Sequence, residues 1–410
     1  MAEIAAGALV VEQIVSTGIE AAAVATVAKP TELIKASFSQ FAATSADDTS
    51  LMLARSRHTI TVIGNKAYIF GGEREDGQLC GTDIHAVAVP SDEVSNDIEY
   101  ACYPAVPDRP SPPARTGHAA CSRQNSLIIL GGRDEHDNFV EDGSALWIWD
   151  LQRKEWTRID GSGEAPTARS DHRIFFNEKH DALILHGGKT GHQGDDSEPV
   201  SSETWLFDFN LAAWNRLPSA PGPPLNAAFV NETLYSISSE SDVSGFIHFL
   251  KLDKSLAWST VDMPTSPLTP GPRPRFGSGL VPITTGYGRY YLIYFFGSRK
   301  GTSLASATHK EKDLFYADMW SLQLPSSGLS GSGVKDAIRD GVPGIDSGAF
   351  TWAEMQITPT EPKQADGKAH PGPRGFFGAD SSADGKSVVF WGGINAKGET
   401  ESDGWLLSLT

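Results

Sequence analysis

The chain has 410 residues, 40% of them hydrophobic, with 41 glycines and 25 prolines and a formal net charge of −17. This composition is typical of a globular protein with many short strands and turns, and it does not suit disorder, which requires low hydrophobicity. The negative charge argues against a nucleic-acid partner, because phosphate binding requires clustered lysine and arginine. Cys80, Cys102 and Cys121 form no CxxC pair, which argues against a disulfide scaffold or a cysteine-rich zinc site.

The N-terminal segment has the pattern of a helix rather than of a targeting signal. Residues 5–28 carry Glu12, Ser16 and Glu20 at i+4 spacing on one polar face. No basic region precedes the apolar residues, and Glu12 interrupts them, which argues against a signal peptide or a membrane span. We therefore assign residues 1–30 to an N-terminal helix and expect a cytoplasmic protein without membrane association. The helix either packs on the rest of the molecule as a cap or forms a homodimer or partner interface.

Short apolar runs followed by a pair of small residues recur along the remaining chain. The first copies stand about 50 to 60 residues apart, a period typical of repeat architectures. The apolar runs predict strands, and a glycine pair permits a sharp exit from each strand. The pairs are Gly71-Gly72, Gly131-Gly132, Gly187-Gly188 and Gly392-Gly393, with the weaker copies Ser238-Ser239 and Gly297-Ser298.

Tryptophans form two columns in register with these runs. One column opens the strand that follows each pair, with Phe249 in the fourth copy, and the other stands nine residues later in copies two to four and is delayed by an insertion in the fifth. Evenly placed aromatic side chains are what wedge-shaped sheets need in order to pack around a common axis. The first column is Trp147, Trp205, Trp320 and Trp405, and the second is Trp156, Trp214, Trp258 and Trp352.

Six copies of the repeat predict an all-β fold, a six-bladed β-propeller of four-stranded antiparallel blades over residues 31–410. The sixth copy lacks its outer strand, whereas residues 31–45 contain the matching motif Phe38-Ser-Gln-Phe41. We predict that this N-terminal strand closes the ring in the last blade and so removes free sheet edges. The Gly/Ser-rich insertion at residues 325–350 is expected to be a mobile surface loop of blade five.

From Arg55 to the end, these columns resemble the kelch-repeat family, which includes galactose oxidase and kelch-like proteins. The resemblance is specific for the fold but not for function, because kelch propellers include protein-recognition modules and unrelated enzymes. It implies that the loops after the glycine pairs and the turns before the first strands share one face, which carries the ligand. The chain lacks the flanking domain of the ubiquitin-ligase adaptors and the copper pattern of galactose oxidase, and it is more similar to stand-alone fungal members.

Five copies begin their first strand with an arginine. The resemblance implies that these arginines reach one mouth of the central channel, where a guanidinium can bind a carboxylate or oxyanion through two parallel hydrogen bonds. Alternatively, each arginine ties strands together through backbone carbonyls and acidic neighbours. The fourth copy has Leu225-Asn226 instead, so the ring is asymmetric. The arginines are Arg55, Arg115, Arg169, Arg275 and Arg374.

Further candidate residues repeat near the same mouth. Histidines in the first three copies are either satisfied core residues or general acids or bases. Glu73 is the best catalytic carboxylate, and Phe276, Phe376 and Phe377 supply apolar walls. No motif indicates a metal, a cofactor or a nucleotide. The histidines are His58, His118 and His172, and the additional cations are Arg133, Lys189 and Arg299.

Three functions fit such a mouth. The first preference is a stand-alone, cofactor-free enzyme that acts on a small molecule. It would be a cyclase or lyase of secondary metabolism, such as a hetero-Diels–Alder cyclase, in which histidines assist loss of water and arginines hold enolate oxygens. The second is a scaffold that binds an acidic peptide through the same arginines. The third is a sugar-acid epimerase that holds a carboxylate with arginine.

Overall fold

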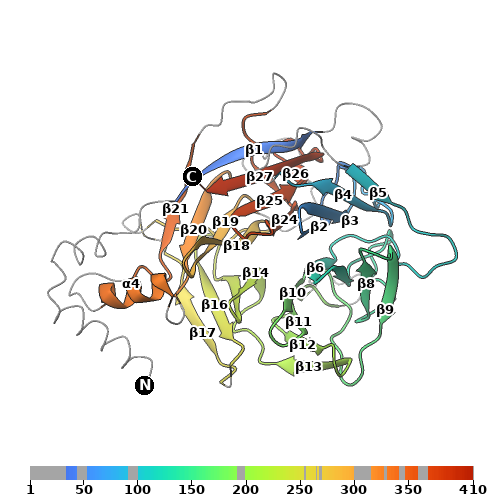
Figure 1. Cartoon of the computed structure of the whole chain (residues 1–410), viewed down its shortest axis with the longest axis horizontal. Coiled ribbons are helices and arrows are strands. Elements are labelled where there is room, and N and C mark those ends of the chain that lie inside the picture. Colours follow the sequence, from blue (N-terminus) through green and yellow to red (C-terminus); the bar gives the residue numbers. More distant parts are fainter. Residues whose placement is uncertain are drawn as a thin grey trace.

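Six sheets of four or five strands each are arranged as a ring around a central axis, which makes a six-bladed β-propeller (Figure 1). The N-terminal helix assigned to residues 1–30, and with it the dimer or partner interface, lies outside the described residues. Among the helices that are described, none is long and apolar enough to cross a bilayer. The computed structural model describes residues 34–43, 53–90, 100–191, 199–253, 255–264, 266, 270–299, 315–326, 330–340, 347–358 and 368–409.

The first five blades are four-stranded antiparallel sheets in which consecutive strands are neighbours. In each blade the first strand lies next to the axis and the last lies at the rim (Figure 1). Blades 1 to 3 consist of β2 (Thr59–Ile63), β3 (Lys66–Phe70), β4 (Ile84–Ala88), β5 (Tyr100–Tyr103); β6 (Ala119–Arg123), β7 (Ser126–Leu130), β8 (Leu146–Asp150), β9 (Glu155–Ile159); and β10 (Arg173–Asn177), β11 (Ala182–His186), β12 (Thr204–Asp208), β13 (Ala213–Leu217). Blades 4 and 5 consist of β14 (Pro224–Val230), β15 (Thr233–Ser239), β16 (Gly245–Lys251), β17 (Trp258–Asp262); and β18 (Gly279–Gly286), β19 (Arg289–Phe295), β20 (Met319–Gln323), β21 (Trp352–Glu354).

The sixth blade combines strands from both ends of the chain. The strand β1, which lies within the predicted segment 31–45, pairs antiparallel with β27, with Phe38 opposite Leu407. The short strand β22 then adds to β1 in parallel, so β1 is not the edge of the sheet. A separate two-stranded ladder precedes the blade. The strands are β24 (Gly378–Ser381), β25 (Ser387–Trp391), β27 (Asp403–Leu409), β1 (Lys35–Ala43) and β22 (Gln356–Ile357), and the ladder joins β23 (Arg374–Gly375) to β26 (Ile394–Asn395).

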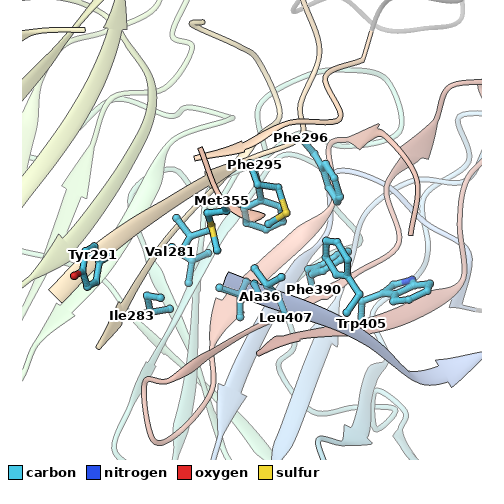
Figure 2. Packing of buried hydrophobic residues seen from close by; sticks show 14 residues of the cluster. Ala36, Val281, Ile283, Tyr291, Phe295, Phe296, Met355, Phe390, Trp405 and Leu407 are labelled. Atoms are coloured by element: carbon cyan, nitrogen blue, oxygen red, sulfur yellow. The ribbon is translucent and has the colours of Figure 1, made fainter. Parts of the chain in front are cut away.

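The hydrophobic core lies between neighbouring blades. Figure 2 shows the cluster between blades 5 and 6, in which Phe295 and Phe296 face Phe390 and Trp405. Phe38 of β1 joins this cluster, with its ring 6.2 Å from the indole of Trp405 in an edge-to-face arrangement. Aromatic side chains are large and rigid, so one on each facing sheet fills the wedge between blades. This packing is what the evenly spaced aromatic columns require.

The insertion in blade 5 contains a helix where the sequence predicted a mobile loop. This helix, α4 (Gly331–Asp340), lies beside the tip of the β18–β19 hairpin (Figure 1). Arg289 at the start of β19 donates two hydrogen bonds to Asp336 of α4, at 2.8 and 2.5 Å, and both side chains are buried. The N–H of Ser332 also donates to the carbonyl of Tyr287. The Gly/Ser-rich composition concealed the helix because tertiary contacts, rather than intrinsic propensity, stabilise it.

Candidate functional site

The turns before the first strands and the loops after the small-residue pairs meet at one end of the axis. Isolated bridges join Ser56 to Glu73 and Ser170 to Lys189, and the corresponding residues of blade 2 are bridged in the same way. In each case the residue after the repeat arginine pairs with the residue after the glycine pair. The shared face that the family resemblance implies is therefore present, and we call this end of the axis the mouth.

An open circle of four backbone hydrogen bonds, here called the belt, links five blades at the mouth. The residue two positions after each repeat arginine has a left-handed backbone, and in four of these five residues the N–H donates to the carbonyl of the equivalent residue in the preceding blade. The N···O distances lie between 2.7 and 3.0 Å. The left-handed conformation turns each of these backbones toward its neighbour, although only two of them are glycines. The belt residues are Arg57, Gly117, Asp171, Gly277 and Phe376, with φ of 52°, 62°, 54°, 57° and 57°.

The five repeat arginines lie beneath the mouth surface rather than on it. Each is at most 2% exposed. In Arg115, Nη1 donates to the carbonyl of Gly131 at 3.0 Å and Nη2 to Asp142 at 2.6 Å. Asp142 also accepts from the indole of Trp147, so one carboxylate joins two repeat columns. The same carbonyl bond occurs in Arg55, Arg169, Arg275 and Arg374, and blades 3, 5 and 6 repeat the ion pair with Glu203, Asp318 and Asp403.

These contacts support the alternative in which the arginines tie strands together. A guanidinium that is buried and bonded to a carbonyl and a carboxylate within its own blade presents little to a ligand. Direct ligand contact by these arginines stays an untested prediction.

The repeat histidines and glycine pairs form contacts between blades. The ring of His172 lies against the first glycine of the preceding blade, where a Cβ added to Gly131 would stand 2.7 Å from its Cε1. The N–H of Gly132 donates to the carbonyl of Arg169 across the same boundary. His58 and His118 are placed in the same way against Gly392 and Gly71.

The surroundings of these histidines favour the core interpretation over acid–base catalysis. Burial, together with Arg169, lowers the pKa of His172 to about 3. Burial and the nearby arginines also lower the pKa values of His58 and His118 well below their usual range. All three imidazoles are therefore neutral at pH 7 and lie far from the pKa that suits a general acid or base.

Three charged side chains meet at the mouth, and we call Arg57, Asp171 and Lys189 the mouth cluster. Arg57 Nη2 donates to both oxygens of Asp171, at 3.0 and 2.8 Å, and Lys189 Nζ lies 3.1 Å from Asp171 Oδ2. The side chains of Arg57, Asp171 and Lys189 are 16%, 31% and 30% exposed, respectively, so ligands can reach them. Although burial acts to raise the pKa of Asp171, Arg57 and Lys189 lower it to about 2.

The cations of the mouth cluster retain donors for a ligand. The side-chain hydrogen bonds of Arg57 both leave from Nη2, so Nη1 has no hydrogen-bond partner among the residues the structure describes. A lysine ammonium has three donors, and Lys189 uses its charge on Asp171 alone in the described part of the chain. The cluster can therefore accept an additional carboxylate without losing its own ion pairs.

The other predicted site residues lie around the mouth cluster, and their side chains differ in character from one side of the mouth to the other. Burial raises the pKa of Glu73, whereas the neighbouring Arg57 lowers it, with a net upward shift. Phe376 lies under Arg57, with the guanidinium carbon 5.9 Å from its ring, and Phe276 is 37% exposed. Phe377 instead packs into the core against Phe295. The mouth is thus charged on blades 1 to 3 and aromatic on blades 5 and 6.

The two remaining predicted cations serve neighbouring contacts. Arg133 is 4% exposed, donates to Ser170 Oγ at 3.0 Å and stacks on Phe139. Arg299 lies with its guanidinium carbon 5.3 Å from the ring of Tyr316. Within the described ranges, no group of three or more His, Cys, Asp or Glu side chains is arranged to hold a metal ion.

The family model of the KLHDC2/KLHL20/DRC7 Kelch-repeats domain matches residues 57–292, more than half of the chain. "Acyl-CoA-binding domain-containing protein 5" of Arabidopsis thaliana is 29% identical over 196 residues, 46% of this chain and 28% of that protein. "Dynein alpha chain, flagellar outer arm" of Chlamydomonas reinhardtii is 26% identical over 306 residues, 69% of this chain and 6% of that protein.

A solved structure, "Structure of YjhT", matches with a TM-score of 0.56 and 12% identity, covering 88% of this chain and 99% of that chain. At this identity the likeness shows the fold alone. The chain spans less than a third of the length of these curated relatives.

Proposed function

Because the chain belongs to the kelch-repeat family, we propose that it is a recognition module that binds an acidic peptide segment at the mouth cluster. The observation that carries this proposal is the pair of accessible cations, Arg57 and Lys189, held by one carboxylate with donors unused. Asp171 orients both cations before the ligand arrives, which lowers the ordering cost of binding. A ligand carboxylate would then bridge the guanidinium and the ammonium.

The aromatic side of the mouth complements this charge. Phe276 on blade 5 and Phe376 on blade 6, which lies under Arg57, offer partly exposed apolar surface. Recognition surfaces commonly combine aromatic contacts with arginine, because the first supply buried area and the second supply orientation. A peptide with an acidic residue beside an apolar one matches this arrangement.

Catalysis has less support from the same geometry. A cyclase, lyase or epimerase working near neutral pH needs an acid or base with a pKa in that range. The repeat histidines are buried and neutral, and the repeat arginines are bonded within their blades. Glu73, whose pKa is raised by burial, is the one predicted catalytic residue that keeps a place at the mouth. Small-molecule chemistry therefore remains a hypothesis that rests on this carboxyl.

Titration with fluorescent peptides tests the binding proposal. The probes are a library of acidic peptides and their Asn/Gln counterparts, followed by fluorescence anisotropy between about 0.05 and 0.5 M salt. We expect micromolar affinity for acidic members only, weakening as salt screens the charges. Lys189→Gln should weaken binding on the order of tenfold, or about 1.4 kcal/mol.

The matched control is Arg158→Gln, which removes a cation on the outer strand β9, where the side chain is 44% exposed. Its affinity should equal that of the unmodified protein. Equal affinity for acidic and neutral peptides would contradict the proposal. A protein that binds no peptide and co-purifies with a small metabolite would also contradict it.

A further inference from the structure

The belt is interrupted at blade 4. In the other blades, the belt residue stands two positions before the first-strand residue that faces the end of the second strand, as Asp171 stands before Arg173. In blade 4 the same position of the ladder is held by Asn226, which pairs with Ile237. Pro224, two residues earlier, therefore occupies the belt position.

Proline cannot act as a belt residue, for two independent reasons. It has no N–H to donate, and its ring fixes φ near about −65°, whereas each of the five belt residues has a left-handed φ. Pro224 follows the sheet instead and pairs with Ser238. The side chain of Asn226 replaces the missing link between blades, because Nδ2 donates to the Ser278 carbonyl at 2.7 Å and Oδ1 accepts from Arg173.

The interruption leaves two backbone groups at the mouth. The carbonyl of Asp171 ends the belt on blade 3, and the N–H of Gly277 begins it on blade 5. Among the residues that the structure describes, neither group has a hydrogen-bond partner. Elsewhere in the belt, one residue supplies both an N–H and a carbonyl between its neighbours. We call the gap between these two groups the opening. It lacks an N–H donor and a carbonyl acceptor, the two main-chain groups that one residue of a peptide carries.

We propose that the opening binds the main-chain N–H and C=O of one ligand residue. The N–H of one ligand residue donates to the Asp171 carbonyl, and its carbonyl accepts from the Gly277 N–H, so the ligand completes the belt. Main-chain pairing with an unpaired backbone edge is a recurring mode of peptide recognition. This inference rests on the proposed function, because it assigns the acidic peptide a second, uncharged point of attachment.

Position and chemistry favour a peptide over a simple anion at the opening. Asp171 contributes its carbonyl to the opening and its carboxylate to the mouth cluster. A ligand residue seated beside that carbonyl therefore places an Asp or Glu side chain near Arg57 and Lys189. An anion without an O–H or N–H, such as chloride or sulfate, can accept from Gly277 but cannot donate to Asp171.

Selective labelling can observe the opening directly. With carbonyl-13C phenylalanine and 15N glycine, NMR signals arise only from the glycines that follow phenylalanine, namely Gly71, Gly277, Gly297 and Gly378. Gly297 is the internal control, because its N–H donates to the Arg374 carbonyl between blades 5 and 6. In the free protein, the amide of Gly277 should exchange with water at least tenfold faster than that of Gly297. Equal protection of the two amides would overturn the proposal.

Three probes separate the inference from the function on which it rests. N-acetyl-aspartate N-methylamide carries the carboxylate and both main-chain groups of the aspartate, its analogue methylated on the acetylated nitrogen lacks the aspartate N–H, and acetate carries the charge alone. We expect the first probe to shift Gly277 and slow its exchange, the N-methylated amide to bind at least threefold more weakly, and acetate to leave Gly277 unchanged. Equal affinity of the two amides, with Gly277 unshifted, would overturn the inference and leave carboxylate binding intact. Failure of all three probes to compete with the labelled acidic peptide would count against both.

A substitution provides the second test. Pro224→Gly restores an N–H and permits a left-handed φ, so blade 4 can close its own belt. This variant should protect the Gly277 amide and bind the acidic peptide at least tenfold more weakly. Pro223→Gly is the matched control and should change neither property. A Pro224→Gly protein that protects Gly277 but keeps full peptide affinity would also overturn the proposal.

Discussion

Blades 2 and 4 have the same four-strand pattern but contain different polar links. In blade 2, a buried guanidinium joins the Gly131 carbonyl to Asp142. Blade 4 has no arginine at this position, and a neutral chain joins its second, third and fourth strands, in which His248 bonds to Ser238 at 2.7 Å and to Thr260 at 2.8 Å. The blade therefore needs a polar link between its strands but not an arginine. The same exchange of residues removes the belt link at blade 4, which leaves the opening that we assign to the ligand.

Strand β1 pairs with β27 in the sixth blade, and removal of β1 tests whether this pairing holds the ring closed. Deleting residues 1–45 would expose Trp405, which is fully buried between blades, and the edge of β27. We expect loss of the cooperative unfolding transition in circular dichroism and calorimetry. Deletion of residues 1–33, which leaves β1 intact, is the control. A protein that lacks residues 1–45 and melts at the unchanged temperature would refute the closure.

The next largest effect should come from the arginine link of blade 2. Arg115→Met leaves Asp142 buried with its charge unpaired, and we expect a loss of about 3–5 kcal/mol in the free energy of unfolding. In blade 4, Ser238→Ala removes one neutral hydrogen bond and should cost about 1 kcal/mol. Chemical denaturation measures both values. Equal losses would show that the two blades do not differ in the way their strands are linked.

Two glycines of blade 2, Gly131 and Gly143, should differ by a smaller amount in the free energy that an alanine substitution costs. Gly131 and Gly143 have similar φ values, 63° and 57°, but a Cβ on Gly131 would lie 2.6 Å from the Arg169 carbonyl, whereas Gly143 has open space. Gly143→Ala should cost about 1–2 kcal/mol for the left-handed backbone alone. Gly131→Ala should cost about 1–3 kcal/mol more, because the contact with blade 3 is too close. Denaturation midpoints that do not separate the two variants would remove the steric reason for the pair.

Near neutral pH, the pH dependence of stability gives the smallest expected effect. His172 has a pKa of about 3 in the folded chain against an ordinary value of 6.5, so only the unfolded chain takes up its proton between these values. The stability that this neutral imidazole contributes is present above pH 6.5 and falls as the pH decreases toward 3, by up to about 1.4 kcal/mol per pH unit. His172→Gln should flatten this slope, and substitution of the exposed His136 should not. An NMR titration of His172 near pH 6.5 would disprove the assignment.

Sequence alone predicts this fold well because a propeller repeats its structural residues. Each blade needs the same strand exits and the same aromatic contacts, so Gly131, Trp147 and their equivalents recur at visible intervals. The ion pairs were also within reach, since an acidic residue precedes Trp205, Trp320 and Trp405 by two positions. The prediction of a mobile loop at α4 was wrong, because the Arg289–Asp336 pair joins segments 47 residues apart.

The candidate site was harder to predict for the same physical reason. Repeated residues are easy to recognise, whereas Arg57 and Asp171 stand at a position whose residue type is not conserved among the blades, with Gly117, Gly277 and Phe376 as its other members. Their proximity arises from the belt, which brings together residues separated by 114 positions in the chain. The asymmetry at Leu225-Asn226 was visible in the sequence, but the role of Pro224 required the ladder register of blade 4.

The central claim is that repeated residues hold the fold and that non-repeated residues bind the ligand. Two arginines of the same turn, Arg55 and Arg57, test this claim most directly. The measurement is the dissociation constant of the labelled acidic peptide for Arg55→Met and Arg57→Met, each below its unfolding midpoint. We predict that Arg57→Met weakens binding about tenfold or more, whereas folded Arg55→Met binds within about twofold of the unmodified protein. Full affinity in Arg57→Met together with lost affinity in folded Arg55→Met would contradict the claim.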